Sequence, residues 1–252
     1  MTENNTTKTV LVTGANKGIG FHIARALGEQ GYTVFVGARS EERGEQAATQ
    51  LREEGLDARF LHLDVTDPAV VNAAAKHVKD EFGSLDALVN NAGIALADGG
   101  WNTSELTVET TRKVFETNVI GVVSVTNAFL PLIRESAAGR IVNVSSEVGS
   151  FGFTTDPNQP FAGMQVGAYG ASKAALNMLT TSYAIELKET PIKINAMTPG
   201  FTKTDLNENK GWRAPEISAK VAVDLATLNE DGPHGGFFQE GLDYHADTTV
   251  PW

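Results

Sequence analysis

Short apolar segments alternate with amphipathic segments along most of this 252-residue chain. The apolar runs are rich in β-branched residues and end at glycine or polar residues, whereas the intervening stretches carry apolar residues at helical spacing. Near-continuous apolar strands that alternate with helices are typical of a parallel sheet covered on both faces. The predicted strands are residues 9–14, 32–39, 58–65, 85–93, 139–146 and 192–200, and the predicted helices are residues 18–31, 40–55, 67–82, 107–133 and 167–187.

No linker, repeat or low-complexity tract interrupts this alternation. A chain of this length suits one large α/β domain. We therefore expect a single doubly wound domain over residues 1–252, with a mainly parallel sheet and helices on both faces. Ser40 is the predicted N-cap of the second helix.

Composition excludes several classes of function. The net charge of −11 argues against a nucleic-acid surface, which would need a basic stripe. The absence of cysteine excludes disulfides and thiolate chemistry. The N-terminal segment is polar, and no apolar run approaches the length of about 18 residues that a membrane span needs. We expect a cytoplasmic protein with no nucleic-acid, membrane or metal partner.

Glycines follow the first predicted strand in the pattern G-x-x-x-G-x-G, at Gly14, Gly18 and Gly20. The first permits a tight turn, the second lets the backbone approach a pyrophosphate, and the third allows close packing of helix on strand. The N-terminus of the next helix offers free N–H groups to the anion. The sequence therefore predicts dinucleotide binding at Gly14, Asn16, Lys17, Gly18, Ile19 and Gly20.

The end of the second strand distinguishes NADP from NAD. An acidic residue there would bind a free ribose 2′-hydroxyl, whereas an arginine accommodates a 2′-phosphate. This chain has Arg39, and Lys17 lies within the glycine loop. Either cation alone could be a solvated surface residue, but both flank the expected adenosine end. We predict NADP/NADPH as cofactor.

In the segment "AYGASKAALNML", Tyr169 and Lys173 lie four residues apart in a predicted helix. This spacing places them on one helical face. It also occurs by chance on many helices, so the pair alone does not establish catalysis.

The motifs "TGANKGIG", "LDV", "NNAGIA", "TNVIG", "IVNVSS", "YGASK" and "TPGFTKT" occur in this order along the chain. Together they resemble the short-chain dehydrogenase/reductase family, which has a Rossmann-type fold. Further details resemble its NADPH-dependent carbonyl reductases: "EGLDARFLHLDV", "NKGW", "GPHGGFF" and the terminal tryptophan. The resemblance implies transfer of a hydride from NADPH to a ketone or aldehyde.

The resemblance also assigns four catalytic roles. Tyr169 would donate a proton to the carbonyl oxygen. Lys173 would lower the phenol's pKa, ordinarily about 10, and hold the nicotinamide ribose. Ser146, in preference to Ser145, would hydrogen-bond the reacting oxygen. Asn118 would hold a water that links the lysine to solvent.

Further cofactor contacts are implied at the ends of the later strands. Asp64 and Val65 should lie at the adenine. Asn90, Asn91, Ala92 and Gly93 should line the adenosine ribose and support the central strand. The nicotinamide amide and the phosphates should meet the loop after residue 198. The members of that loop are Pro199, Gly200, Phe201, Thr202 and Thr204.

Ser146 and Tyr169 are further apart than in family members with a short loop, because residues 147–167 form an insertion. In carbonyl reductases a longer insertion at this place goes with a monomeric state, so we expect a monomer or a small homo-oligomer. The aromatic residues of the insertion could form a substrate wall or a small satellite core.

Long loops place a group of large apolar side chains near the expected active site. The segment 201–228 is a predicted substrate lid. An apolar, aromatic-lined site favours hydrophobic carbonyl compounds over sugars. A 3-oxoacyl-carrier-protein reductase, a secondary-alcohol or sugar dehydrogenase, and a non-catalytic NADP-sensing regulator are the alternatives. The predicted pocket residues are Trp101, Phe151, Phe153, Leu206 and Trp212.

Overall fold

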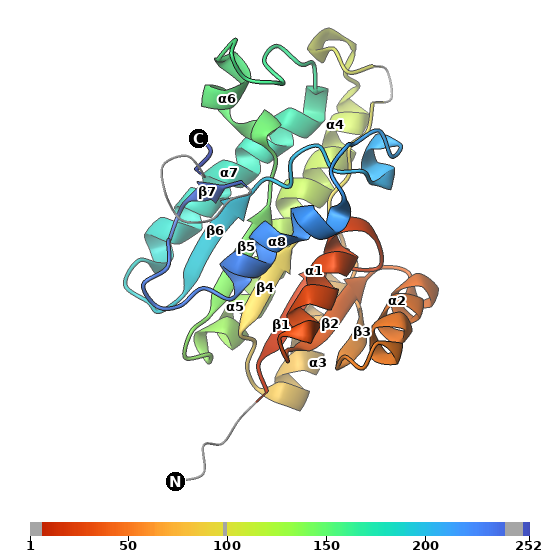
Figure 1. Cartoon of the computed structure of the whole chain (residues 1–252), viewed down its shortest axis with the longest axis vertical. Helices are drawn as coiled ribbons and strands as arrows, with labels where there is room; N and C mark the ends of the chain where they lie inside the picture. The colour runs from red at the N-terminus through yellow and green to blue at the C-terminus, as the bar shows by residue number, and fades with distance from the viewer. Residues whose placement is uncertain (1–6, 98–99, 240–248) are drawn as a thin grey trace.

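A parallel sheet of seven strands forms the centre of the protein (Figure 1). The computed structural model describes residues 7–97, 100–239 and 249–252. The strand order is β3-β2-β1-β4-β5-β6-β7, and each adjacent pair is parallel. The predicted doubly wound, Rossmann-type architecture is confirmed. The strands are β1 (Thr9–Thr13), β2 (Thr33–Ala38), β3 (Ala58–His62), β4 (Ala87–Asn90), β5 (Arg140–Val144), β6 (Lys193–Met197) and β7 (Phe237–Phe238).

Helices cover both faces of the sheet. One apolar cluster joins the sheet to α1, α2 and α8, and a second joins it to α3, α5 and α7. Figure 1 shows α1 and α8 side by side across the front of the sheet, where they pack against each other. The helices are α1 (Gly18–Glu29), α2 (Glu41–Glu53), α3 (Pro68–Phe82), α4 (Val108–Phe115), α5 (Gly121–Arg134), α6 (Phe151–Thr155), α7 (Gly167–Leu187) and α8 (Pro215–Ala226).

Local sequence explains where several helices begin. The predicted N-cap of α2 is confirmed, because the Ser40 side chain accepts a hydrogen bond from the Arg43 backbone. Asp67 caps α3 in the same way at 2.9 Å from the Ala69 nitrogen, and a proline follows at the first helical position. Each cap satisfies a backbone donor that the first turn leaves without a partner.

The carboxyl ends of β1 and β4 meet at the point where the chain winds outward in both directions. The Thr13 hydroxyl accepts hydrogen bonds from the backbone nitrogens of Asn91 and Ala92, both at 2.9 Å. The Asn91 side chain donates to the Thr13 carbonyl at 2.8 Å. These bonds hold the loops after the two strands together at the edge where doubly wound sheets bind ligands.

The single helix predicted for residues 107–133 is interrupted. A π-helical turn, Glu116–Ile120, separates α4 from α5. By length and composition the continuous stretch Val108–Arg134 could cross a bilayer, with a mean hydropathy of 1.3 in its most apolar window. We expected no apolar stretch long enough to span a membrane, and the mean hydropathy of this stretch contradicts that expectation. However, 56% of that window is buried within the fold, and α5 packs on α3 and β4.

Two further expectations need correction. The third strand ends at His62 rather than at residue 65. Residues 215–226, predicted as part of a lid, form α8, which begins with proline and buries Val221 and Leu225 in the main core. Its apolar residues recur at helical spacing, a pattern that the lid interpretation overlooked. We therefore narrow the predicted lid to residues 201–214.

Candidate active site

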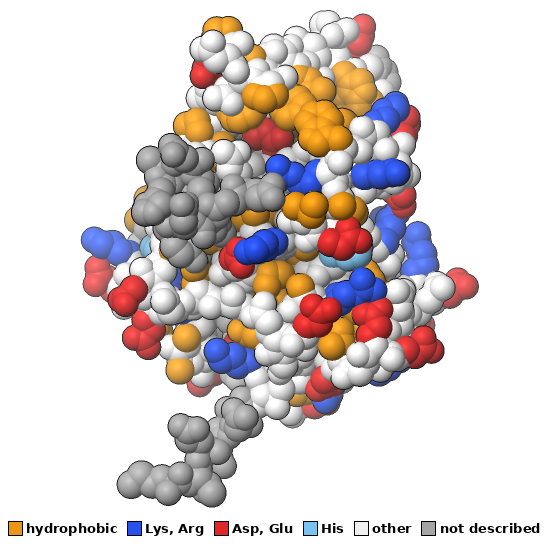
Figure 2. Space-filling view, in the orientation of Figure 1, with side chains coloured by type: hydrophobic (Ala, Val, Ile, Leu, Met, Phe, Trp, Pro, Cys, Tyr) orange, Lys and Arg blue, Asp and Glu red, His pale blue; other side chains and the backbone are white. Residues whose placement is uncertain are grey.

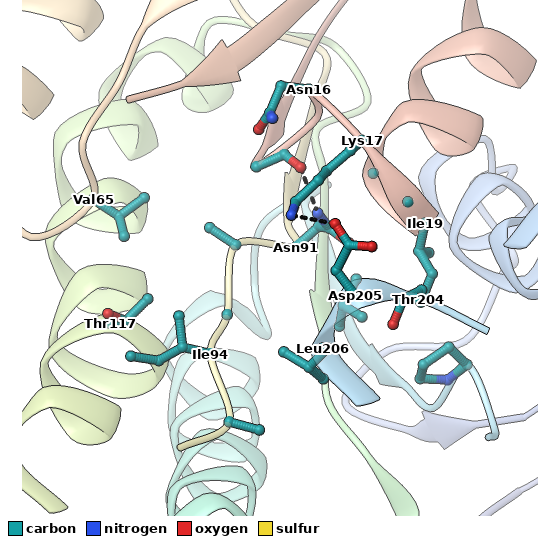
Figure 3. A pocket seen from close by; sticks show the side chains of 18 of the residues that line it. Asn16, Lys17, Ile19, Val65, Asn91, Ile94, Thr117, Thr204, Asp205 and Leu206 are labelled. Carbon is teal, nitrogen blue, oxygen red and sulfur yellow. Dashed lines mark hydrogen bonds and ion pairs between the residues drawn. The ribbon is translucent and has the colours of Figure 1, made fainter. Parts of the chain in front are cut away.

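A cavity of about 620 Å³ lies at the carboxyl edge of the sheet. It extends from the glycine loop after β1 to the side chains of Tyr169 and Lys173 on α7. The loops after β2, β3, β4, β5 and β6 also contribute to its wall. The cavity therefore joins the predicted cofactor residues to the predicted catalytic pair. Figure 3 shows it from close by.

Backbone conformation shapes the glycine end of the cavity. Gly14 and Gly18 have φ angles of +65° and +58°, a region that residues with a side chain rarely adopt. A Cβ on Gly20 would lie 2.7 Å from the Gly14 carbonyl oxygen and would also collide with Asn91. The glycines thus permit the turn and the close packing of α1 on the strand ends, as the sequence predicts.

The two predicted phosphate-binding cations are in different situations. Lys17 forms an ion pair with Asp205 at 2.6 Å, which joins the glycine loop to the segment after β6 (Figure 3). Arg39 is exposed at the end of β2 and lines the cavity. Within the described residues it forms no hydrogen bond or ion pair, so its guanidinium is available to a ligand.

Tyr169 and Lys173 face the opposite end of the cavity from one helix. The Lys173 ammonium lies 5.6 Å from the centroid of the tyrosine ring. It is 4% exposed and donates a hydrogen bond to the Val144 carbonyl at 2.7 Å. The four-residue spacing thus brings both groups to the end of β5.

The expected fall in the pKa of Tyr169 is not found. Burial of the phenol raises its pKa above the ordinary value, and the negative charge of Glu147 acts in the same direction. A hydrogen bond with Ser146 opposes this shift without reversing it. Burial also lowers the pKa of Lys173 to about 8. Tyr169 therefore keeps its proton at neutral pH in this structure.

The neighbouring serines after β5 have separate roles. The Ser145 hydroxyl donates to the Asn177 side chain at 2.5 Å and is buried against α7. The Ser146 hydroxyl instead donates to the Glu147 carboxylate at 3.4 Å, and it also lowers the pKa of the Tyr169 phenol. Ser145 lines the cavity and Ser146 does not, so the choice of Ser146 as the serine beside the reacting oxygen stays a prediction.

Asn118 lies in the π-helical turn and is fully buried. Its side chain accepts from the Ile94 nitrogen and donates to the Ile94 carbonyl, both at 2.9 Å. It also donates to the Ser172 hydroxyl at 3.0 Å. A Cβ on Gly93 would lie 3.4 Å from the Asn118 amide oxygen and 3.7 Å from the Lys173 nitrogen. These groups therefore converge beside Gly93, and the predicted water stays a prediction.

Most of the predicted cofactor residues line the cavity. Asn90 does not, because its amide donates to Thr126 and Asn143 inside the protein and supports the central strand. Thr202 is also directed away, since its hydroxyl bonds Ser218 at 2.6 Å. Gly200 and Phe201 lie outside the wall as well. The predicted residues that line it are Gly14, Asn16, Lys17, Gly18, Ile19, Gly20, Arg39, Asp64, Val65, Asn91, Ala92, Gly93, Tyr169, Lys173, Pro199 and Thr204.

The predicted substrate pocket is only partly assembled as expected. Leu206 lines the cavity, whereas Trp101, Phe151 and Trp212 are exposed, at 44%, 72% and 71%. Phe153 is buried in a satellite core with Ala196, Phe237 and Val250, against which Phe161 packs. The assignment of Phe153 to the pocket wall is therefore wrong, because Phe153 packs in the satellite core with Phe237 of β7.

An aromatic cluster not predicted from the sequence lies outside the cavity wall. It consists of Phe161 from the insertion and Phe201 and Trp212 from the segment after β6. The Phe161 and Trp212 rings stack at 5.9 Å, and Phe201 meets Trp212 edge-on at 4.9 Å. Figure 2 shows hydrophobic side chains gathered in the upper part of this face. The cluster connects the two loops expected to border the substrate.

Sequence reasoning also missed several polar groups. Lys203 and Asp205 line the cavity from the segment after β6. Glu147 follows Ser146 directly and is 7% exposed. Its position after a strand end was a usable signal, because such residues lie at the ligand edge of the sheet.

Comparison with known proteins agrees with this geometry. The model of the family described as short chain dehydrogenase matches residues 8–214. Carbonyl reductase [NADPH] 1 of Sus scrofa is 35% identical, with 93% of this chain and 92% of that protein covered. The (+)-neomenthol dehydrogenase of Arabidopsis thaliana is 35% identical, with 92% and 96% covered. A solved variant of actinorhodin polyketide ketoreductase with NADPH is 30% identical, with a TM-score of 0.79 and coverage of 93% and 95%.

Proposed function

Because this chain belongs to the short-chain dehydrogenase family and is an oxidoreductase, we propose that it reduces a ketone or aldehyde with NADPH, with Tyr169 as the proton donor. The observation that carries this proposal is the continuous cavity between the glycine loop and the Tyr169–Lys173 pair. The relatives named for carbonyl reduction with NADPH support it.

The residues of the cavity fit a dinucleotide phosphate. At Gly14 and Gly20 a Cβ would crowd Ala92, Asn91 or the turn's own backbone, so glycine allows the tight turn that leads into the N-terminus of α1, whose N–H groups can bind a pyrophosphate. Arg39 at the far end is available to a 2′-phosphate, for which arginine offers a planar pair of donors. When bound, the cofactor supplies the hydride. No acidic residue of the cavity wall precedes Asp64 in the chain, which disfavours NAD as the preferred cofactor.

The protein side chains would manage the proton and the developing negative charge. The Ser146 hydroxyl acts on the Tyr169 phenol, so a carbonyl oxygen bound beside both side chains can accept from the two hydroxyls when Ser146 turns away from Glu147, to which it donates here. Tyr169 then transfers its proton to that oxygen. The Lys173 ammonium beside the ring stabilises the phenolate that remains. Since the pKa of Tyr169 is raised, the resting enzyme holds the proton that reduction requires.

The substrate class follows from the side chains near the reacting end. Leu206, Ile94 and Leu96 line the cavity, and the aromatic cluster lies beyond it. Hydroxyl-rich sugars would need several polar partners there, whereas a ring ketone can bury apolar surface. We propose bulky aryl or alicyclic ketones as substrates.

The test is the absorbance change of NADPH and of NADH with a panel of an aryl ketone, an alicyclic ketone, an acyl thioester and an aldose. We expect NADPH to be oxidised fastest with the ring ketones. A preference for NADH would contradict the cofactor assignment. Sugars or thioesters as the best substrates would instead favour the alternative dehydrogenase or carrier-protein reductase activity. The Tyr169→Phe variant provides the background rate.

A further inference from the structure

Glu147 places a carboxylate beside the proposed proton donor. It follows Ser146 in the chain, and its Oε2 atom lies 3.4 Å from the Ser146 hydroxyl. The same oxygen accepts a hydrogen bond from Thr198 at the end of β6. Its charge acts on Tyr169 closely enough to raise the pKa of the phenol. Glu147 therefore lies beside the proposed proton donor, although it is not among the residues of the cavity wall and the proposed reduction assigns it no role.

No cationic side chain of the described residues pairs with this carboxylate. Glu147 is 7% exposed, yet no lysine, arginine or histidine in the described part of the chain forms an ion pair with it. Its hydrogen-bond partners are two hydroxyl groups. A buried charge without a counter-charge is costly, so such groups are ordinarily paired. A bound cation would remove this cost.

One oxygen of the carboxylate remains open to a ligand. Both hydrogen bonds engage Oε2, and Oε1 accepts none within the described residues. Among the described residues, Arg25 Nε is a side-chain atom that is sealed from solvent and has no hydrogen-bond partner. Oε1 of Glu147 also lacks a partner, but it is not sealed in this way. It is thus reachable from the solvent side, as a ligand atom would require.

Aromatic rings belong to the segment that follows Thr198. Thr198, which binds Glu147, is three residues before Phe201, so the two are separated by at most about 11 Å. Phe201 contacts Phe161 and Trp212. Figure 2 shows an acidic surface recessed beneath hydrophobic side chains in this upper part of the molecule. A carboxylate next to aromatic faces is a favourable environment for an organic cation.

We propose that Glu147 binds a protonated amine of the substrate, so that the enzyme prefers ketones bearing a cationic nitrogen near the carbonyl. This inference rests on the proposed function and specifies its substrate class. The carbonyl oxygen would lie between Ser146 and Tyr169, while the ammonium group meets Oε1 of Glu147 and the aromatic cluster. Glu147 is then a specificity-determining residue, and the neutral ring ketones of the panel are poorer substrates.

The test compares two ketones of nearly equal shape, 1-methyl-4-piperidone, which is cationic at neutral pH, and 4-methylcyclohexanone, which is neutral. The readout is the ratio of their kcat/KM values with NADPH. We expect the cationic ketone to be preferred roughly ten- to a hundredfold, as for a charge-assisted hydrogen bond. In Glu147→Gln the ratio should fall close to one. Because one preparation supplies both values, partial misfolding lowers both and leaves the ratio unchanged.

Asp156→Asn is the matched control, since it removes the same charge from an exposed position of the same insertion. It should leave the ratio unaltered. A ketone that is not turned over is measured as an inhibitor of the best panel ketone, and the two inhibition constants give the same ratio.

Three results are distinguishable. A wild-type ratio near one, or a ratio unaffected by Glu147→Gln, overturns the amine assignment while leaving carbonyl reduction in place. If Glu147→Gln leaves the ratio unchanged but weakens the binding of NADP⁺ more than the binding of NADPH, the carboxylate interacts with the oxidised nicotinamide instead. That result also overturns the amine assignment. Failure of every panel ketone to oxidise NADPH is a failure of the proposed function itself.

Discussion

At the glycine loop backbone conformation shapes the cavity, whereas the aromatic cluster, which lies outside the cavity wall, is built from side chains. Gly14, Gly18 and Gly20 shape the first region through φ angles and through the absence of Cβ atoms. In the second region, Phe161, Phe201 and Trp212 approach one another from two separate loops. One region thus depends on conformations that few residues can adopt, and the other on contacts that many apolar residues could make.

This difference indicates how the protein separates its two tasks. A cofactor shared by many reductions needs the same phosphate cradle each time, and backbone groups held by the sheet provide it. A substrate pocket must differ between enzymes, and exposed side chains on loops can change without disturbing the core. Substitutions should therefore abolish function in the first region and redirect it in the second.

The largest effect is expected for Tyr169→Phe, at the boundary between the two regions. Loss of the proton donor should lower kcat by roughly a hundred- to ten-thousandfold. NADPH affinity should remain nearly unchanged, because the glycine loop and Arg39 are untouched. Steady-state kinetics and a fluorescence titration of NADPH measure the two quantities. Turnover at the parent rate would show that another group supplies the proton.

Arg39→Ala tests the first region. Loss of a charge-assisted contact to the 2′-phosphate, worth about 1.5–3 kcal/mol, should weaken NADPH binding roughly ten- to a hundredfold. NADH carries no 2′-phosphate, so its kinetic constants should change little. Calorimetric titrations with both cofactors provide the comparison. Equal losses for the two would mean that Arg39 supports the structure rather than the phosphate.

The pH dependence of kcat/KM tests the role of Lys173, which acts on both regions. Burial lowers the pKa of this lysine to about 8, so its ammonium charge is present below that pH and is lost above it. Where reduction depends on this charge, kcat/KM should be level below pH 8 and then fall up to about tenfold per pH unit. Tyr169, whose pKa is raised, would remain protonated over this range. A rate that rises through pH 8 would contradict the role given to the ammonium.

Trp212→Ala tests the second region. Removing one ring of the aromatic cluster should raise KM for an aryl ketone about two- to tenfold, as for the loss of an aromatic contact. The affinity for NADPH should remain unchanged. Phe151→Ala is the control, because Phe151 is 72% exposed and takes part in no ring contact among the described residues. If both variants behave alike, the cluster does not contact the substrate.

The smallest effect is expected for Asp205→Asn, which removes the bond between the two regions. Lys17 would then be released from its ion pair and become available to a phosphate. NADPH should bind about two- to fivefold more tightly, since exposed ion pairs are weak. The gain should shrink in high salt. Weaker binding of NADPH would indicate that the pair closes over the cofactor and helps to retain it.

The sequence predicts one region far better than the other. The turn at Gly14 and the shared face of Tyr169 and Lys173 follow from rules that act within a few residues. The parallel arrangement of the strands then follows from the alternation of strand and helix, whereas the strand order and β7 were not predicted. The satellite core around Phe153 and the ion pair between Lys17 and Asp205 join residues that are distant in the chain. Neither contact leaves a local pattern, because each depends on where the whole sheet brings its loops.

The satellite core also bears on the order in which the molecule assembles. It unites residues of the insertion with Ala196, Phe237 and Val250, and contacts so far apart in sequence close slowly because of the loop entropy they must overcome. A nascent chain can form the glycine loop early, but it cannot complete the satellite core before residue 250 has been synthesised. The same small cluster should also open first in the native state, so its amides should exchange hydrogen faster than those of the central strands. The glycine loop can thus be in place before the satellite core closes.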